Sequence, residues 1–146
     1  MITLNDSTFR PQLHANLLAV FPDLAGRIND DVQRAMPGKG DLPRAFVTLG
    51  DPKPDYRGEQ ASFSEVQISY PYTLLVEFAW PASGTIEAAR LTALQALLAQ
   101  LTASPRYCDR VFRIIDIRLV STDNKEPNEP TFGFAVEITI EDTSDR

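Results

Sequence analysis

Residues 65–80 read EVQISYPYTLLVEFAW, and this stretch decides the fold. From Val66 to Trp80 every second residue is apolar, while the residues between them are mostly polar. Apolar residues at a period of two predict a β-strand that buries one of its faces. The apolar positions are Val66, Ile68, Tyr70, Tyr72, Leu74, Val76, Phe78 and Trp80.

The length of this strand indicates that it bends or that part of it projects from the body of the protein. Fifteen extended residues reach about 50 Å, because each residue adds roughly 3.3 Å. A compact domain of 146 residues is only about 38 Å across. Pro71 lies inside the stretch, where a proline is expected at a sheet edge or a bulge. A projecting β-arm that still alternates apolar residues would need a partner, which indicates an oligomer.

Two helices are expected on either side of this strand in the sequence. The first begins at Ser7, whose hydroxyl can cap it, and ends before Pro22, which disfavours helical geometry in the preceding residue. The second begins at the capping residue Thr85 and runs to about Thr102 along an apolar stripe. The stripe consists of Ile86, Ala89, Ala93, Leu94, Leu97, Leu98 and Leu101.

Shorter strands and loops make up the rest of the chain. Arg44–Leu49 has the composition of a short strand, and residues 26–43 are expected to hold a weak strand followed by a loop. Residues 50–62 contain two prolines and two glycines among mixed charges, which predicts a mobile loop. The last third of the chain predicts a β-hairpin and a frayed tail. The hairpin strands and the tail are residues 111–120, 131–141 and 143–146.

These elements predict an α+β domain with a mostly antiparallel sheet and both helices packed on one face. We expect a single domain over residues 1–146, with an extended β-hairpin arm around residues 50–71. The apolar stripe of the second helix is expected to pack on the sheet. The expected contact residues are Leu94, Leu97, Leu98 and Leu101 on the helix and Val76, Phe78, Val136 and Ile138 on the sheet.

The composition excludes several classes of protein. The formal net charge is -6, with no basic stripe, whereas a protein that grips duplex nucleic acid needs Lys and Arg against its phosphates. The single cysteine, Cys108, excludes an intrachain disulfide and favours a reducing compartment. The first residues lack a signal-peptide pattern, and no apolar segment is long enough to span a bilayer. We therefore expect a soluble, cytosolic protein.

No group of residues predicts catalysis or metal binding. His14 and Cys108 are solitary, whereas a nucleophile and its base also need an orienting group and an oxyanion site. The turn at residues 37–41 lacks the Gly-Lys-Ser/Thr ending of a phosphate-binding loop. The many carboxylates do not match the spacing of a calcium loop. We expect no catalytic residue, no cofactor and no metal site.

The order of the elements carries a resemblance to a known family. A helix is followed by the Pro-led strand LPRAFVTL at residues 42–49 and a charged loop. The long strand ends in FAWPA at residues 78–82, and a helix and a C-terminal hairpin follow. This layout resembles the tail terminator (tail completion) proteins of long-tailed bacteriophages and related contractile tails. The resemblance covers about residues 7–141 and contains no specific short motif.

The resemblance implies a structural virion protein without catalytic residues. Such a protein forms a homohexameric ring that caps the tail tube, ends its polymerisation and provides the surface for head (neck) attachment. The implied partners are further copies of itself, the tail tube protein and a head-completion or neck protein. DNA would pass through the lumen without specific binding, and no membrane would be involved. The implied location is the tail or neck of the virion, and the host cytoplasm during assembly.

Two alternatives come from other classes of protein. The first is a small, non-enzymatic binding adaptor that offers a sheet edge to a peptide. The second, less favoured, is a small enzyme. The particle mass separates the first from a ring, because a hexamer has six times the 16.2 kDa of one chain, whereas an adaptor has one or two copies.

Two charged loops, residues 51–62 and 121–130, are the expected contact surfaces, because recognition residues concentrate in loops carried on rigid strands. Tyr56 and Arg57 belong to residue types that are enriched at interface hot spots. The charged residues near them can pair across a subunit boundary. The candidate interface residues are Lys53, Asp55, Tyr56, Arg57, Glu59, Lys125 and Glu126.

Overall fold

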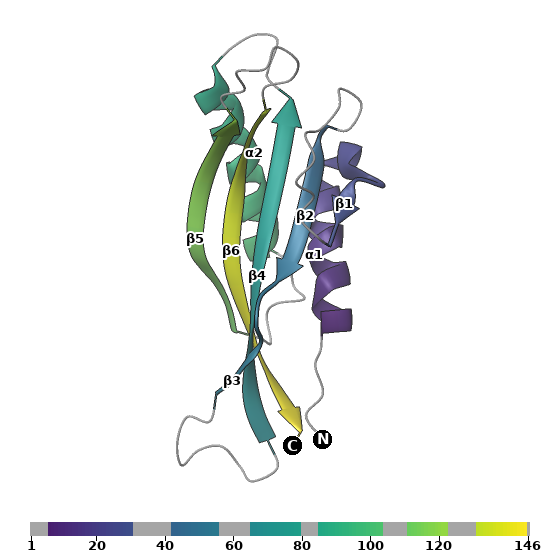
Figure 1. Ribbon diagram of the computed structural model, residues 1–146, viewed down its shortest axis with the longest axis vertical. Helices are drawn as coiled ribbons and strands as arrows, with labels where there is room; N and C mark the ends of the chain where they lie inside the picture. Colours follow the sequence, from purple (N-terminus) through teal and green to yellow (C-terminus); the bar gives the residue numbers. More distant parts are fainter. Residues whose placement is uncertain are drawn as a thin grey trace.

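The long alternating strand, β4 (Glu65–Ala79), lies at the centre of the sheet in the computed structural model of the protein (Figure 1). The structure describes residues 6–30, 42–55, 65–79, 85–103, 111–122 and 131–145. Their strands form one six-stranded sheet in the order β1-β2-β4-β6-β5, and β3 also pairs with β4. Both helices lie on one face of this sheet, behind it in Figure 1.

The helices and strands follow the predicted order. The helices are α1 (Asp6–Val20), the short 3-10 helix η1 (Pro22–Leu24) and α2 (Ile86–Ala103). The other strands are β1 (Ile28–Asn29), β2 (Arg44–Leu49), β3 (Lys53–Asp55), β5 (Val111–Thr122) and β6 (Thr131–Asp145). Only β1 and β2 pair in parallel among these strands. The predicted α+β class, with a mostly antiparallel sheet and helices on one face, is confirmed.

The core lies between the helices and the sheet face that carries the apolar positions of β4. Alternate side chains of a strand point to opposite faces, so the period of two in β4 places its apolar residues together under the helices. Phe78 and Leu98 are only partly buried against this core. The predicted packing of α2 on the sheet is confirmed. The core includes Phe9, Leu13, Leu17, Tyr70, Tyr72, Leu74, Val76, Leu94, Leu97, Leu101, Val136 and Ile138.

One predicted helix cap is confirmed and the other is wrong. The N–H of Ala88 donates to Oγ1 of Thr85 at 3.2 Å, so Thr85 caps α2 as expected. The prediction for Ser7 fails because α1 already begins at Asp6, which places Ser7 inside the helix. Asp6 lies in the first turn, where the positive end of the helix dipole stabilises a carboxylate.

The loop predicted for residues 50–62 contains a strand. Lys53–Asp55 form β3, which pairs with Ser69, Ile68 and Gln67 of β4. The composition of the segment suggested a mobile loop, but β2 ends opposite Tyr72 and leaves the first part of β4 without a neighbour on that side. β3 supplies this neighbour for Gln67, Ile68 and Ser69. Residues 56–62 lie outside the described part of the chain.

Pro71 is accommodated without a bulge in β4. The predicted bulge is wrong, since β4 pairs with β6 over all of its residues, but Pro71 lies at a local edge, between the residues of β4 that pair with β2 and those that pair with β3. The carbonyl of Pro71 accepts a hydrogen bond from the Gly50 N–H at 2.8 Å. The nitrogen and carbonyl of one strand residue point to the same side, so the missing N–H of Pro71 faces the break between β2 and β3.

The C-terminal residues are not a frayed tail. β6 continues to Asp145, and its last residues pair with the beginning of β4, Asp145 opposite Glu65. The polar composition of this end predicted fraying, but the partner strand is long enough to hold it. β4 and β6 therefore form a continuous ladder of fifteen residues each.

Candidate assembly surface

A three-stranded arm extends from one end of the sheet. It consists of β3, the first residues of β4 and the last residues of β6. β5 ends its pairing with β6 at Val111 opposite Glu141, so the following residues of β6 continue past β5. Figure 1 shows the three strands running beyond the lower ends of both helices. The expected β-hairpin arm around residues 50–71 did not include β6, whereas here the last residues of β6 pair with the beginning of β4.

Two of the candidate interface residues lie in this arm. Lys53 is exposed and pairs with Ser69 of β4, and Asp55 pairs with Gln67. These two residues are brought together on β3, as their spacing in the sequence requires. The other candidates, Tyr56, Arg57, Glu59, Lys125 and Glu126, lie outside the described residues.

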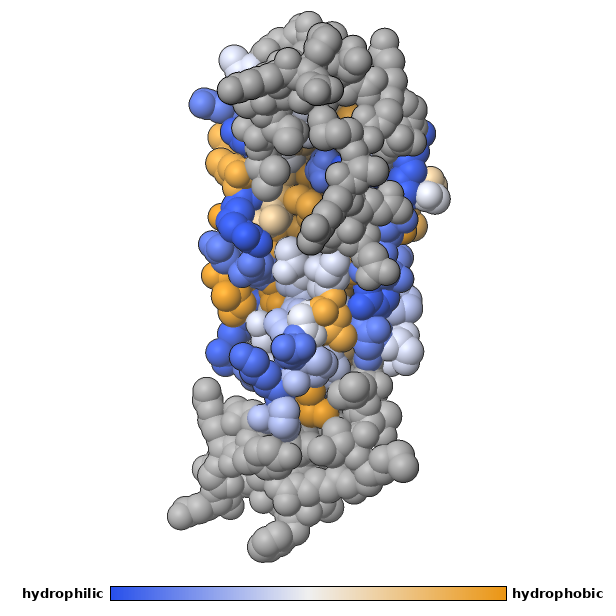
Figure 2. All heavy atoms as spheres, viewed as in Figure 1, coloured by the Kyte–Doolittle hydropathy of each residue, from blue (hydrophilic) through white to orange (hydrophobic). Residues whose placement is uncertain are grey.

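A shallow hollow of about 310 Å³ lies at the base of the arm. It opens on the sheet face opposite the helices, since Ser69 and Thr139 alternate with residues of the buried face. Three charged residues from three strands meet at it: Lys53, Arg113 and Glu141. The rest of the lining is mixed, with the polar Ser69 and Thr139 and the apolar Pro71 and Ile115, and the middle of this face shows pale, blue and orange atoms in Figure 2. Such a surface can take an extended segment of a neighbouring protein.

A second hollow of about 330 Å³ continues this surface along the sheet. The two share Pro71, Ile115 and Thr139 in their linings. Sequence reasoning missed Arg113 and Glu141, because they are far from Lys53 in the chain and meet it only through the strand order β3-β4-β6-β5. The alternation of apolar and other residues over 131–141 is a signal that could have placed Glu141 on the open face, and residues 111–120 carry no such regular alternation for Arg113.

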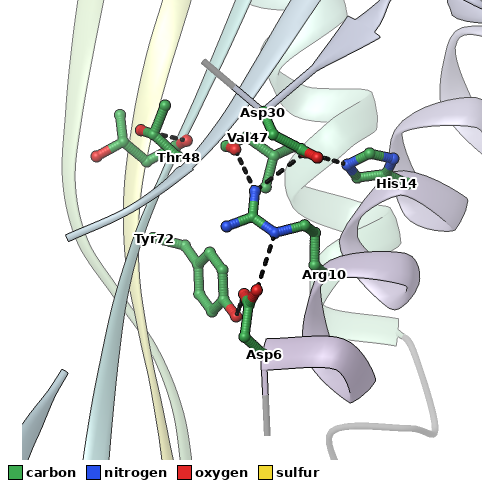
Figure 3. A network of polar contacts seen from close by, with 8 residues as sticks. Asp6, Arg10, His14, Asp30, Val47, Thr48 and Tyr72 are labelled. Atoms are coloured by element: carbon green, nitrogen blue, oxygen red, sulfur yellow. Dashed lines mark hydrogen bonds and ion pairs between the residues drawn. The ribbon is translucent and has the colours of Figure 1, made fainter. Parts of the chain in front are cut away.

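A polar network fixes α1 to the other face of the sheet, the one that the helices cover (Figure 3). Arg10 of α1 lies at its centre and donates to Asp6 Oδ2 at 3.2 Å, Asp30 Oδ1 at 3.0 Å and the carbonyl of Val47 at 2.6 Å. The hydroxyl of Tyr72 donates to Asp6 Oδ1 at 2.6 Å. The network thus joins α1, β2, β4 and the residue after β1.

The network changes the proton affinity of two of its members. Burial alone would lower the pKa of the Arg10 guanidinium, but the hydrogen bonds to Asp6 and Asp30, and their negative charges, raise that pKa. Burial and the hydrogen bond to Asp6 raise the pKa of the Tyr72 phenol well above its ordinary value of 10.0. Both groups keep their protons at neutral pH, so the hydrogen bonds of the network hold α1 against the sheet.

His14 belongs to the margin of the same network. Its Nε2 lies 3.1 Å from Asp30 Oδ1, and the side chain is partly buried. Cys108 lies outside the described residues.

Neither a metal centre nor a membrane span is found in the described part of the chain. Within those residues, no three His, Cys, Asp or Glu side chains form a group that could hold a metal ion. None of the described helices is both long and apolar enough to cross a membrane. A scan of the chain against protein-family models finds no match, and a search of curated proteins finds no related sequence.

Proposed function

We propose that the protein is a structural assembly protein of the tail terminator type. It forms a ring, expected to contain six copies, that caps a tail tube and ends its polymerisation. The exposed face of the ring then provides the surface for head (neck) attachment. In this proposal the protein has no catalytic role, and its partners are its own copies, the tube protein and a neck protein.

The observation that supports the proposal is the projecting arm. A hairpin or short ribbon that leaves the body of a domain exposes backbone N–H and C=O groups, which favour pairing with another chain. The arm carries Lys53 and Asp55, one cation and one anion, on its outer strand β3. The hollow beside its base adds Arg113 and Glu141. Arm and hollow together offer two surfaces on one protomer that neighbours in a ring can use.

The charge of the chain agrees with a ring that DNA crosses. The net charge is -6, and acidic walls repel phosphates, so DNA can move through a lumen without being held.

The test combines particle mass, particle shape and tube capping. Light scattering of the purified protein, alone and mixed with its tube protein, should give a particle near six times 16.2 kDa. Negative-stain images should show rings, and added protein should shorten tubes grown in vitro. Particles of one or two copies at every concentration, together with tubes of unchanged length, would contradict the proposal.

A second candidate is the adaptor that binds a peptide at a sheet edge. The outer edge of β5 favours it, since no described strand pairs there. An adaptor is expected as one or two copies and leaves tube length unchanged. The same mass and tube measurements therefore distinguish the two functions.

A further inference from the structure

The two margins of the sheet, at β2 and at β5, differ in how the hydrogen-bonding groups of their backbone are paired. At the β2 margin, β1 pairs with Ala45 and Phe46. The N–H of Ala45 donates to the carbonyl of Arg27 at 3.0 Å. The guanidinium of Arg10 donates to the carbonyl of Val47 at 2.6 Å. A two-residue strand and an arginine thus close this margin, which is a common way to prevent edge pairing.

The β5 margin is not covered by another described strand, and its register with β6 shifts between Ile114 and Asp116. β5 is twelve residues long and pairs with β6, and no described strand pairs with its outer edge. Ile115, Ile117 and Leu119 are 59%, 39% and 54% exposed on it. Hydrophobic atoms also appear along the left margin of the molecule in Figure 2, where β5 lies in Figure 1. A long edge strand with exposed apolar side chains favours pairing with another strand.

We propose that the outer edge of β5 pairs with the same edge of a second copy, antiparallel, around a two-fold axis at Ile117. A second copy offers a closed margin at β2 and an open margin at β5. Among the described strands, β5 of the second copy is therefore the long open edge with which β5 of the first copy can pair. The contact is isologous, with each copy using the same residues.

The charges on β5 select Ile117 as the centre. Directly opposed residues of paired strands point to the same face of the sheet. The two-fold axis must therefore lie where one residue is directly opposite its own equivalent in the second copy, and not midway between two successive residues. An axis at Asp116 opposes two carboxylates, and an axis at Arg118 opposes two guanidinium groups. An axis at Ile117 places Asp116 of each copy opposite Arg118 of the other, which forms two ion pairs. An axis at Leu119 leaves both charges opposite uncharged residues in the sequence.

The contacts that Asp116 and Arg118 make within one protomer leave them able to form these ion pairs with a second copy. Arg118 donates one nitrogen, Nη2, to Glu137 Oε1 at 2.7 Å, and a guanidinium has five donors. Asp116 accepts the N–H of Ile117 through Oδ1 at 2.9 Å, and its second oxygen can accept another donor. Asp116 also lies opposite Glu137 in the β5–β6 register, a like-charge pairing that a cation of the second copy would relieve.

The inference does not rest on the proposed function. Rotation about the two-fold axis reverses the strand direction of one copy relative to the other, so the arms point to opposite ends of the pair. In a ring whose tube face differs from its head face, all protomers have the same orientation relative to the ring axis. The β5 pair is therefore a contact of the protein outside such a ring, and its presence or absence is measured separately from tube capping.

A disulfide between identical residues tests the centre of the contact. The Ile117→Cys variant, in a Cys108→Ser background, is oxidised at low concentration and run on a non-reducing gel. Opposed residues of antiparallel strands have Cα atoms about 4.5–5.5 Å apart, which a disulfide can bridge. A covalent dimer is expected in high yield. Leu119→Cys in the same background is the control, because its equivalents would be about 13 Å apart along the strands. No dimer for Ile117→Cys, or equal yields for both variants, would overturn the inference.

A charge exchange gives an independent test in solution. Asp116→Arg and Arg118→Asp each place like charges across the axis, so native mass spectrometry should show at least a tenfold loss of dimer for each variant. When the two variants are mixed, opposite charges face each other, and the mixed dimer should form. Circular dichroism confirms that both variants are folded. A mixture that stays monomeric, or single variants that dimerise like the natural protein, would overturn the proposal. Dimers that persist in both variants but bind added peptides at β5 would favour the adaptor.

Discussion

At the scale of single residues, the carboxylate of Asp6 joins α1 to the sheet through the hydroxyl of Tyr72. It accepts hydrogen bonds from both Tyr72 and Arg10. Tyr72 belongs to the apolar alternation of β4, but its hydroxyl is polar, and a buried tyrosine hydroxyl needs a partner. The helix start at Asp6 supplies that partner, so a residue predicted to be core also fixes where α1 lies.

Tyr72→Phe should destabilise the protein and change how its stability depends on pH. Loss of the hydroxyl leaves Asp6 without that donor, which costs about 1–3 kcal/mol. The folded pKa of Tyr72 is raised above 10.0, so the unfolded state loses this proton first as the pH rises. The stabilisation by Tyr72 is thus complete below about pH 10 and declines above it. Urea unfolding at pH 8 and pH 10.5 should show a smaller decline for the variant; equal declines would contradict the assignment.

Gly133 of β6 is required by a close approach to β4. A Cβ at this position would collide with the backbone carbonyl of Val76, which cannot move without shifting the strand. Gly133→Ala should therefore cost about 1–3 kcal/mol, as overpacking does, when measured by urea unfolding. Gly50→Ala is the matched control, since its Cβ would lie 3.3 Å from the Pro71 side chain and needs only a small adjustment. Similar losses for the two variants would contradict this explanation.

At the scale of elements, α2 shows how one helix divides its apolar residues between core and surface. Leu97 is fully buried, Leu98 is partly buried and Leu91 is 56% exposed. The helical pattern predicted a broad stripe without ranking its members. The ranking follows from which of these side chains pack against the core of the sheet.

Leu97→Ala should destabilise the protein by about 2–5 kcal/mol, because it removes a buried side chain and leaves a cavity. Leu98→Ala should cost less, and Leu91→Ala should stay within about 0.5 kcal/mol as a surface control. Thermal or urea unfolding of the three variants measures this order. A loss below about 1 kcal/mol for Leu97→Ala would mean that the packing of α2 is wrongly assigned.

At the scale of the whole molecule, the body and the arm have separate roles. The body holds the core between the helices and the sheet, and the arm continues past it on β3, β4 and β6. Pro71 lies where the neighbouring strand changes from β2 to β3. The missing N–H of this proline therefore coincides with the base of the arm.

Deletion of residues 52–60 removes β3 and should leave the body folded, because the core residues belong to other elements. Under the proposed function, the deletion variant fails to form its ring or to cap tubes, and tails grow to uncontrolled length. Tyr56→Ala with Arg57→Ala is a milder variant that keeps β3. Circular dichroism checks the fold and electron micrographs measure tail length. Tails of normal length with attached heads would exclude this segment as the contact site.

Local pattern in the sequence determined the long central strand, the two helices and the hydrophobic face. The alternation in Glu65–Ala79 and the leucine stripe before Ala103 are local patterns. The geometry of a strand or a helix determines, over a few neighbouring residues, which side chains lie on the same face. The same patterns indicated that Val76 and Leu97 belong to one core. Of the candidate interface, they indicated only that Lys53 and Asp55 lie in one charged segment.

The tertiary structure alone decided the strand at Lys53–Asp55, the pairing of Asp142 with Ile68, and the closure of the β2 margin by Arg10. These features depend on partners far along the chain. A polar segment such as the C-terminal end has little preference of its own, and it becomes a strand because β4 leaves backbone groups unpaired beside it. The hollow between Lys53, Arg113 and Glu141 arises for the same reason: strand order brings together residues that have no local relation in the sequence.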